Sequence, residues 1–466
     1  MTNPAVLDWL EKNHEHLVRD LGDLVAIQSI STDGEHAPQI QASAELTCEH
    51  MKKAGLENIA ILKTGDSYPY AYGEWLDAPG KPTVFLYAHH DVQPVNDVGE
   101  AKWAQADPFK LTRRDGRLFA RGAADDKGAI TAQLGAIAAY RKTVGKLPVN
   151  VKVLVEGEEE IGSSNLLGFF KEHKKRLMSD VIVVCDTENI EVGLPSITYA
   201  LRGIVSAVVE VQTGTMPVHS GMAGGALADA AVALSAILGR LFWDHGKLPI
   251  PGYYDQVRPM TETERKAMAQ LPQHPDKLRH DLGILPGVEF ANEKDVCLYE
   301  QTWRLPAITV TALEASSFKH VSNQVLPRAR AMVSCRIVPD QDPEVVFEKL
   351  KAFLTANPPW NAKVTVQPGG SVKWWMTSPT GPAFTAALDA MHQGFGKKPA
   401  MIGCGGTIGF VGPLADLFGG APALLMGIED PQSNAHAPNE SLHEGDWKNL
   451  MRSLAILFTN LGNMKV

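Results

Sequence analysis

The run Thr-Val-Phe-Leu-Tyr-Ala at residues 83–88, followed directly by His89, His90 and Asp91, decides the fold class of this chain. Two further runs have the same nearly continuous apolar texture, Val-Lys-Val-Leu-Val at 151–155 and Val-Ile-Val-Val-Cys at 181–185. Such runs are typical of strands covered on both faces, as in a parallel sheet. Between the first two, residues 128–141 have the Ala, Leu and Ile spacing of a buried crossover helix. The sequence therefore predicts an α/β layer.

The pattern of apolar residues changes near Gly203 and returns to the earlier pattern near Pro379. Between these points the patterns predict strands at 204–211, 307–312, 328–338, 363–366 and 372–375, and helices at 226–241 and 343–355. After Pro379 the buried-strand texture resumes, with a helix at 383–394 and a strand at 423–428. We therefore predict an α/β fold whose mostly parallel central sheet, flanked by helices, is interrupted by an inserted α+β domain. The predicted boundaries are 1–199 and 379–466 for the first domain and 200–378 for the insertion.

Length and composition bound the class of protein. A chain of 466 residues suggests two or three domains, at ~100–200 residues each. With 44 Lys+Arg against 53 Asp+Glu, the formal net charge of -9 disfavours nucleic acid and anionic membrane surfaces as partners. No run approaches the ~20 uninterrupted apolar residues that cross a bilayer. We expect a soluble globular protein.

The cysteines and the N-terminus indicate the compartment. The five cysteines are odd in number, scattered, and without a CxxC pair: Cys48, Cys185, Cys297, Cys335 and Cys404. This usage is typical of a reducing environment. Residues 5–25 have the pattern of an amphipathic helix with Pro4 in its first turn, and no signal peptide is visible. We expect a cytoplasmic protein.

Acidic and imidazole side chains follow the predicted strands where each strand ends. The residues concerned are His89, His90 and Asp91; Glu156, Glu158, Glu159 and Glu160; Asp186; and His436. A further pair, Asp125 and Asp126, directly precedes the crossover helix. In doubly wound sheets the ligand crevice lies outside the carboxyl ends of the strands, so these groups are expected to meet. Carboxylates crowded there repel one another, and a pair of divalent cations removes that cost.

Each of these pieces has a simpler interpretation when taken alone. A His-x-Asp after a strand is typical of a capped turn, the run Glu158-Glu159-Glu160 of a solvated charge run, and Asp125-Asp126 of a helix N-terminus. Their coincidence at one edge of one sheet favours the metal site. Because the ligands mix imidazole and carboxylate without thiolate, zinc suits them, and manganese or cobalt does too.

The same segments resemble the successive motifs of the M20 metallopeptidases. The matching stretches are Ala-His-His-Asp-Val-Gln-Pro (88–94), Arg-Gly-Ala-Ala-Asp-Asp-Lys-Gly (121–128), Glu-Gly-Glu-Glu-Glu-Ile-Gly-Ser (156–163), the strand end at Asp186, and Ala-His-Ala-Pro-Asn-Glu (435–440). Their order and spacing cover essentially the whole chain. Val-Gln-Pro after Asp91 and Tyr-Ala-Leu-Arg-Gly at 199–203 are most similar to the carnosinase-type, cytosolic nonspecific dipeptidases of that family.

The resemblance implies a dinuclear centre and its catalytic groups. One metal would be held by His89 and Asp186, the other by Glu160 and His436, with Asp125 as the bridging carboxylate. Such a bridge holds two cations roughly 3.5–4 Å apart, where a shared water loses its proton near neutral pH. Glu159 would then be the general base, and Asp91 would orient the His89 imidazole. His90 and Glu158 match no required position and are expected to be structural.

The resemblance also suggests residues for substrate binding. His219, in Pro-Val-His-Ser-Gly (217–221), resembles a lid histidine that reaches the partner subunit's active site and stabilises the oxyanion. Arg336 matches a lid arginine that pairs with a substrate carboxylate, and Asn323 is a candidate for the same pocket. The remaining candidates belong to a backbone turn suited to a small anion, Gly405, Gly406 and Thr407. Without the resemblance, His219 is simply a surface histidine before a turn.

We therefore expect an enzyme that hydrolyses dipeptides with two metal ions and forms a homodimer through the inserted, or lid, domain. An N-acyl-amino-acid deacylase of the same family is the alternative, because it shares all of this chemistry. A binding protein that has kept the scaffold is a third possibility, but Glu159 and all five ligand positions are intact. The sequence leaves open the metal, the preferred side chains and the physiological substrate.

Overall fold

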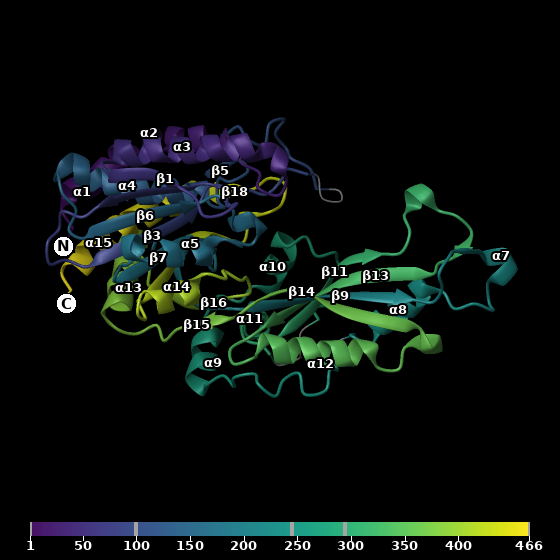
Figure 1. Ribbon diagram of the computed structural model, residues 1–466. Helices are drawn as coiled ribbons and strands as arrows, with labels where there is room; N and C mark the ends of the chain where they lie inside the picture. The colour runs from purple at the N-terminus through teal and green to yellow at the C-terminus, as the bar shows by residue number, and fades with distance from the viewer. Residues whose placement is uncertain (1, 97–100, 243–246, 292–295, 465–466) are drawn as a thin grey trace.

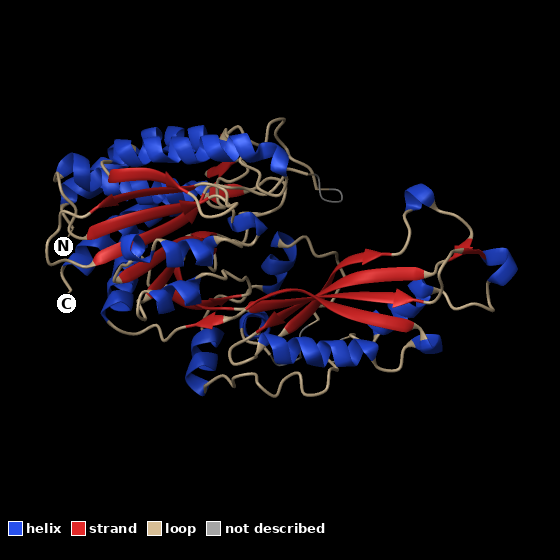
Figure 2. Cartoon of the chain, in the orientation of Figure 1, coloured by secondary structure: helices blue, strands red, loops and turns tan. Residues whose placement is uncertain are grey.

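The chain forms two parts, each built on its own sheet, that give the molecule an elongated shape (Figure 1). The computed structural model describes residues 2–96, 101–242, 247–291 and 296–464. Both chain ends lie on the larger part, which is covered by helices on its two faces (Figure 2). The fold class predicted from the sequence is confirmed.

The central sheet of the larger part has nine strands in the order β1-β2-β6-β3-β7-β17-β8-β15, with β16 also paired to β8. Its middle strands β6, β3, β7 and β17 are parallel, whereas β1, β2 and β15 pair antiparallel at the two sides. The strands are β1 (Glu57–Leu62), β2 (Tyr70–Trp75), β3 (Thr83–His89), β6 (Asn150–Glu156), β7 (Val181–Glu188), β8 (Ser196–Leu201), β15 (Trp375–Met376), β16 (Ala400–Cys404) and β17 (Ala423–Glu429).

Two hydrophobic cores explain why the middle strands are apolar at every position. In β3, Val84 and Leu86 face one core, whereas Phe85 and Tyr87 face the other. One face is covered by α1 (Pro4–Lys12), α2 (His14–Val25), α3 (Ala37–Ala54), α4 (Lys127–Thr143), α13 (Pro382–Phe395) and α15 (Glu444–Gly462). The opposite face is covered by α5 (Leu166–Glu172) and α14 (Val411–Leu417). Because both faces of these strands are buried, apolar and polar residues do not alternate along their sequence.

The smaller part has a four-stranded antiparallel sheet in the order β11-β13-β9-β14. Its strands are β9 (Gly203–Gln212), β11 (Ala307–Glu314), β13 (Arg328–Ile337) and β14 (Lys363–Val372). Burial alternates residue by residue along β9 and β13, because α8 (Ala230–Gly239) and α12 (Pro343–Thr355) pack on one face only. This is the period-2 pattern that the sequence shows.

The chain enters the smaller sheet directly from β8 into β9 and leaves it from β14 into β15. The smaller part is therefore inserted in the chain path of the larger one, while the limits 200 and 378 remain predictions. The remaining elements are β4 (Thr112–Arg114), β5 (Arg117–Phe119), α6 (Lys174–Leu177), β10 (Val218–His219), α7 (Ser220–Ala223), α9 (Glu262–Ala269), α10 (Pro275–Asp281), α11 (Leu298–Trp303), β12 (Gln324–Val325), β18 (Ser441–His443) and the 3-10 turns η1 (Gly34–His36), η2 (Glu159–Ile161), η3 (Phe318–His320) and η4 (Pro359–Asn361). Among the described residues, no helix has the length and apolar character needed to span a bilayer.

Three element boundaries differ from the predicted ones. The single helix expected at 5–25 is interrupted at Asn13, which separates α1 from α2. The helix expected at 226–241 begins only at Ala230, because the Asp229 side chain caps it by accepting from the N–H groups of Ala231 and Val232. The strand expected at 363–366 continues to Val372 as β14, whose pairing to β9 is irregular between Pro368 and Gly370, and the segment expected at 372–375 is divided between the end of β14 and the start of β15.

Candidate metal centre

The carboxyl ends of the parallel strands bring the predicted ligands together. His89 is the last residue of β3, Asp186 lies near the end of β7, and Glu160 lies in η2 directly after β6. His436 is in the loop after β17, and Asp125 is in the turn before α4. All five lie at the same edge of the sheet, as expected from the topology.

Asp125 lies between two imidazoles. Its Oδ1 atom is 2.9 Å from His89 Nε2, and its Oδ2 atom is 2.9 Å from His436 Nε2. Glu160 Oε2 is 3.1 Å from the same nitrogen of His436. One carboxylate thus joins two halves of a site, which is the placement expected of a bridging ligand.

Two groups of ligand atoms form around this carboxylate, each with all its atoms within 4.8 Å of one another. One group contains Asp125, Glu160 and His436, and the other contains His89, Asp126 and Asp186. The sequence pattern assigns Asp126 no ligand role beyond its place in an acidic pair. Its Oδ2 atom accepts the His89 N–H at 3.2 Å, while Oδ1 is buried and has no partner in the described structure.

The electrostatics of the cluster favour the binding of cations. Burial raises the pKa values of Asp126 and Asp186 well above the usual range. Hydrogen bonds to Asp125 and Glu160 raise the pKa of His436 to about 11, so the cluster stabilises positive charge strongly. Imidazole and carboxylate donors without thiolate suit zinc, manganese or cobalt. The residues therefore fit divalent metal ions.

Asp91 joins the end of β3 to the turn that carries the acidic run. Its two carboxylate oxygens accept the backbone N–H groups of Glu159 at 3.1 Å and Glu160 at 3.0 Å. The Ser31 hydroxyl donates to Oδ2 at 2.6 Å, and His89 Nδ1 lies 3.4 Å from Oδ1 and 3.1 Å from the Asp91 carbonyl. This buried carboxylate can therefore position both an imidazole and the Glu159 backbone.

The neighbouring acidic residues separate into different environments. Glu159 lines the cavity beside the cluster, and burial among other carboxylates raises its pKa to about 7. Glu158 instead accepts from the Tyr70 hydroxyl at 2.8 Å and from the Asn165 N–H at 3.0 Å, away from the two ligand groups. His90 is buried, with Nε2 at 3.0 Å from the Pro69 carbonyl. These contacts fit the structural roles expected for Glu158 and His90.

One buried carboxylate fixes the turn that carries Asp125. Glu440 Oε2 accepts from Arg121 Nη1 at 2.6 Å and from the Gly122 N–H at 3.0 Å. Its Oε1 accepts from the N–H groups of Ala124 at 2.9 Å and Asp125 at 3.1 Å. Glu440 lies four residues after His436, so it ties two loops of the centre to each other.

A cavity of about 980 Å³ extends from Glu159 to the smaller sheet and is lined there by Arg336, Thr407, Trp374 and Trp375. Arg336 Nη1 donates to the Thr407 hydroxyl at 2.8 Å. The expected anion-binding turn is only partly open to this cavity. Gly405 and Gly406 are not among its lining residues, and the Gly406 N–H is directed at the Cys404 sulfur at 3.2 Å.

His219 and Asn323 lie elsewhere in this chain. They lie close to each other where β10 pairs with β12 and the Ser220 N–H donates to the Asn323 carbonyl. Helix α7, which begins at Ser220, lies at the distal end of the smaller part (Figure 1). Asn323 precedes β13, whereas Arg336 is near the end of that ten-residue strand, a separation of roughly 30 Å at ~3.3 Å per residue. Within one chain, neither residue is brought to the metal ligands, and their roles stay predictions.

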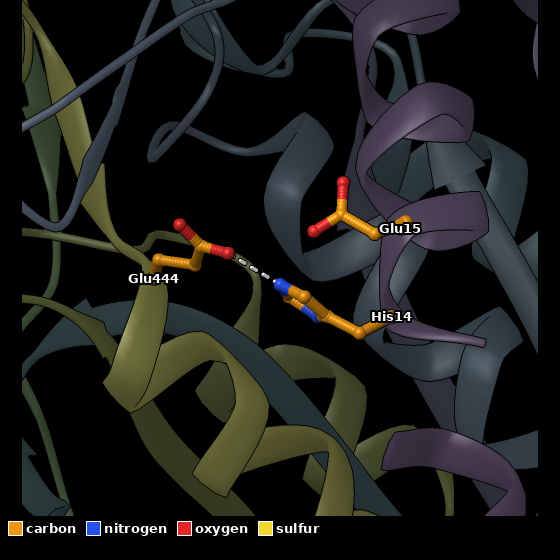
Figure 3. A group of neighbouring side chains, drawn as sticks. All are labelled: His14, Glu15 and Glu444. Carbon is orange, nitrogen blue, oxygen red and sulfur yellow. Dashed lines mark hydrogen bonds and ion pairs between the residues drawn. The ribbon is translucent and has the colours of Figure 1, made fainter. Parts of the chain in front are cut away.

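A second histidine and carboxylate group has a different character (Figure 3). His14 Nε2 is 2.5 Å from Glu444 Oε1, with Glu15 nearby. Arg113 pairs with both Glu15 at 2.9 Å and Glu444 at 3.0 Å. Because a guanidinium already neutralises these carboxylates, the group is an ion-pair network that joins α2 to α15.

Comparison with known proteins agrees with this geometry. Residues 85–460 match the model of peptidase family M20/M25/M40. The chain belongs to this family. The match covers every ligand of the centre and both segments of the larger part that carry them, so this M20 peptidase has the family's metal-dependent framework.

Several relatives of the chain are named dipeptidases. The chain is 32% identical over 435 residues to the cysteinylglycine-S-conjugate dipeptidase of Corynebacterium striatum, covering 93% of this chain and 92% of that protein. It is 28% identical to the beta-Ala-His dipeptidase of Rattus norvegicus, covering 99% and 96%. The structure of human carnosine dipeptidase 1 matches with a TM-score of 0.87 at 26% identity, covering 98% of each chain.

Proposed function

We propose that this M20 peptidase hydrolyses the amide bond of dipeptides, using two divalent metal ions held by His89, Asp125, Glu160, Asp186 and His436. The observation that carries the proposal is Asp125, whose two oxygens face the imidazoles of His89 and His436. The two relatives with assigned activity named above are also dipeptidases. Zinc is the preferred metal, with manganese and cobalt as alternatives.

When bound, the cations polarise the scissile carbonyl and make an attacking water more acidic. Glu159 accepts the proton of that water and later donates it to the leaving amine. Asp91 positions the base through its bond to the Glu159 N–H, and it orients His89 at the same time. Asp126 holds the His89 backbone and is an additional candidate ligand.

The substrate carboxylate is recognised at the end of the cavity opposite Glu159. Arg336 presents a planar guanidinium, oriented by Thr407, to the carboxylate at the C-terminus of the dipeptide. Gly405 and Gly406 support this end as part of the same turn. The alternative, an N-acyl-amino-acid deacylase, uses the same carboxylate contact, so the acyl side alone distinguishes the two activities. The named relatives favour the dipeptidase.

The proposal includes a homodimer in which the lid domain supplies His219 to the partner's centre, and it keeps Asn323 as a candidate for the substrate pocket of Arg336. We base it on the position of His219, which is exposed at the distal end together with exposed apolar side chains such as Met222, Phe318 and Val321. A cytoplasmic location is part of the same proposal.

The test is a substrate panel with metal-free and metal-reloaded protein. Dipeptides, tripeptides and N-acetyl amino acids are assayed after chelation and after addition of zinc, manganese or cobalt. We expect dipeptide cleavage only after reloading. Preferential cleavage of N-acetyl amino acids would replace the dipeptidase with the deacylase, and activity that survives complete metal removal would contradict the metal-dependent mechanism.

A companion variant tests the bridge. Asp125→Ala removes the carboxylate that both imidazoles face, so we expect loss of bound metal and of activity with the fold retained. Elemental analysis and circular dichroism measure both quantities. Full metal occupancy in this variant would show that Asp125 is not a bridging ligand.

A further inference from the structure

Arg202 is a half-buried cation whose charge the proposed mechanism does not use. It lies between β8 and β9, and its Nε and Nη1 atoms donate to the carbonyls of Gly405 at 3.2 Å and Leu305 at 3.3 Å. Carbonyl groups accept these hydrogen bonds but do not neutralise the charge. Within the described ranges, no aspartate or glutamate forms an ion pair with Arg202.

Arg202 is linked to Arg336, the residue proposed to bind the substrate carboxylate. The Thr407 hydroxyl accepts from Arg336 Nη1 at 2.8 Å and donates to the Arg202 carbonyl at 2.6 Å. Arg336 also pairs with Ile204 across β13 and β9, only two residues from Arg202. Arg336 likewise has no acidic partner in the part of the chain that the structure describes.

The glycine turn is shaped around the Arg202 guanidinium. A Cβ atom at Gly405 would lie 2.8 Å from Arg202 Nη2 and 3.1 Å from the Thr302 carbonyl. A side chain at this position therefore requires the guanidinium to move, because the backbone carbonyl cannot give way easily. The turn that carries Gly405, Gly406 and Thr407, expected from the sequence to suit a small anion, thus also lies against a cation.

Two neighbouring cations without an anion make this end of the cavity receptive to negative charge. Burial lowers the pKa of Arg202 to about 10, with the charge of Arg336 acting in the same direction, and burial also lowers the pKa of Arg336. A carboxylate that enters beside Arg336 relieves the repulsion between the two guanidinium groups. The favourable field acts on the substrate even though Arg202 is not among the residues that line the cavity.

We propose that Arg202 is a specificity-determining residue that acts with Arg336 to select substrates with a free C-terminal carboxylate. This inference rests on the proposed dipeptidase function and adds the source of its selectivity. Arg336 contacts the carboxylate, while Arg202 supplies a second positive charge behind Thr407 and holds the turn that orients this threonine. Arg202 is thus a positioning residue and does not touch the reacting atoms.

The test compares a dipeptide with its C-terminal amide in the metal-loaded enzyme. Arg202→Gln keeps an N–H donor but removes the charge. We expect KM for the free acid to rise on the order of tenfold, with kcat changed much less, while the kinetics of the amide stay near those of the wild type. Arg202→Lys, which keeps the charge, should retain most of the preference for the acid.

Arg240→Gln is the matched control, because Arg240 also donates to backbone carbonyls, but those of Phe353 and Leu354 in α12 and not that of the turn that carries Thr407. Metal content and the melting temperature are measured for every variant. If Arg202→Gln melts below the assay temperature, Arg202→Met removes the charge without adding a buried polar group.

An equal loss for acid and amide, or no loss for either, would overturn the proposal and leave Arg202 with a purely structural role. The proposal would also be overturned if Arg202→Lys lost its preference for the free acid as fully as Arg202→Gln does. A wild-type enzyme that cleaves no dipeptide contradicts the proposed function itself, so the two failures are distinguishable.

Discussion

Asp125 shows how a single side chain can organise a centre of this kind. Its two oxygens face different imidazoles, and its backbone N–H is held at 3.1 Å by Glu440. A carboxylate with both oxygens engaged and its backbone fixed has little freedom to rotate. The same chain region also places Asp126 beside His89, so consecutive acidic residues serve the two halves of the site.

At the residue scale the first prediction concerns Glu159. Glu159→Gln is nearly isosteric but cannot accept a proton, and Gln retains the backbone N–H that Asp91 holds. We expect kcat to fall by a factor on the order of 10² to 10⁴ while metal content is unchanged. Steady-state kinetics and elemental analysis measure the two effects.

Glu158→Gln is the control, because Glu158 is bonded to Tyr70 and Asn165 and belongs to neither ligand group. Normal turnover by Glu159→Gln would place the base elsewhere. If Glu159→Gln also loses bound metal, Glu159 is a metal ligand, and the roles of base and ligand proposed here are exchanged.

The sequence could predict the residues that follow strands but not every partner within the cluster. His89, Glu160 and Asp186 follow directly from the ends of β3, β6 and β7, because parallel strands end at one edge. Asp126 was missed as a candidate ligand, since a sequence does not reveal which of two consecutive side chains turns toward which half of a site. The adjacent acidic pair was the available signal.

At the element scale, Glu440 joins the segment before β18 to the turn before α4. All four of its partners are donors, namely Arg121 and three backbone N–H groups of the turn. In Glu440→Gln an amide NH₂ group would face some of these donors. We expect metal affinity to fall by roughly 10- to 100-fold and the free energy of unfolding to fall by ~2–4 kcal/mol.

Metal titration and denaturant unfolding measure these changes. Glu444→Gln is a matched control, since Glu444 is also ion-paired, with His14 and Arg113, but touches neither the turn at 121–126 nor His436. Equal effects of the two substitutions on metal affinity would mean that Glu440 contributes only general stability.

Elements with a clear hydrophobic pattern were predicted well, and those set by local contacts were not. The strands β3, β6 and β7 lie where their apolar runs are, because both faces of each strand are buried. The late start of α8 depends on a single cap, Asp229, and the break between α1 and α2 depends on the non-helical backbone of one residue, Asn13. The short sheet of β18, β5 and β4 joins segments more than 300 residues apart and has no periodic signal.

At the scale of the whole molecule, the distance between the two ends of the lid domain is the decisive feature. Arg336 is near the metal-centre end of β13 and lines the cavity, whereas His219 is near the opposite end of the smaller sheet. Apolar patterns could not predict this separation, because it depends on how the inserted sheet is oriented, and only the family resemblance of the segment at 217–221 implied it. A catalytic role for His219 therefore requires a second copy of the chain.

The last prediction tests this requirement by complementation. His219→Ala and Glu159→Gln are each expected to be inactive, but a mixed dimer contains one site with wild-type His219 and wild-type Glu159. Random exchange makes half of the dimers mixed, with one intact site of two, so activity should recover to at most about one quarter of the wild-type value. The assay is turnover after mixing, with subunit exchange followed by labels on the two variants. Met222→Asp, an exposed change near His219, should lower recovery if this surface forms the interface. Absence of recovery despite measured exchange would show that His219 does not act across subunits.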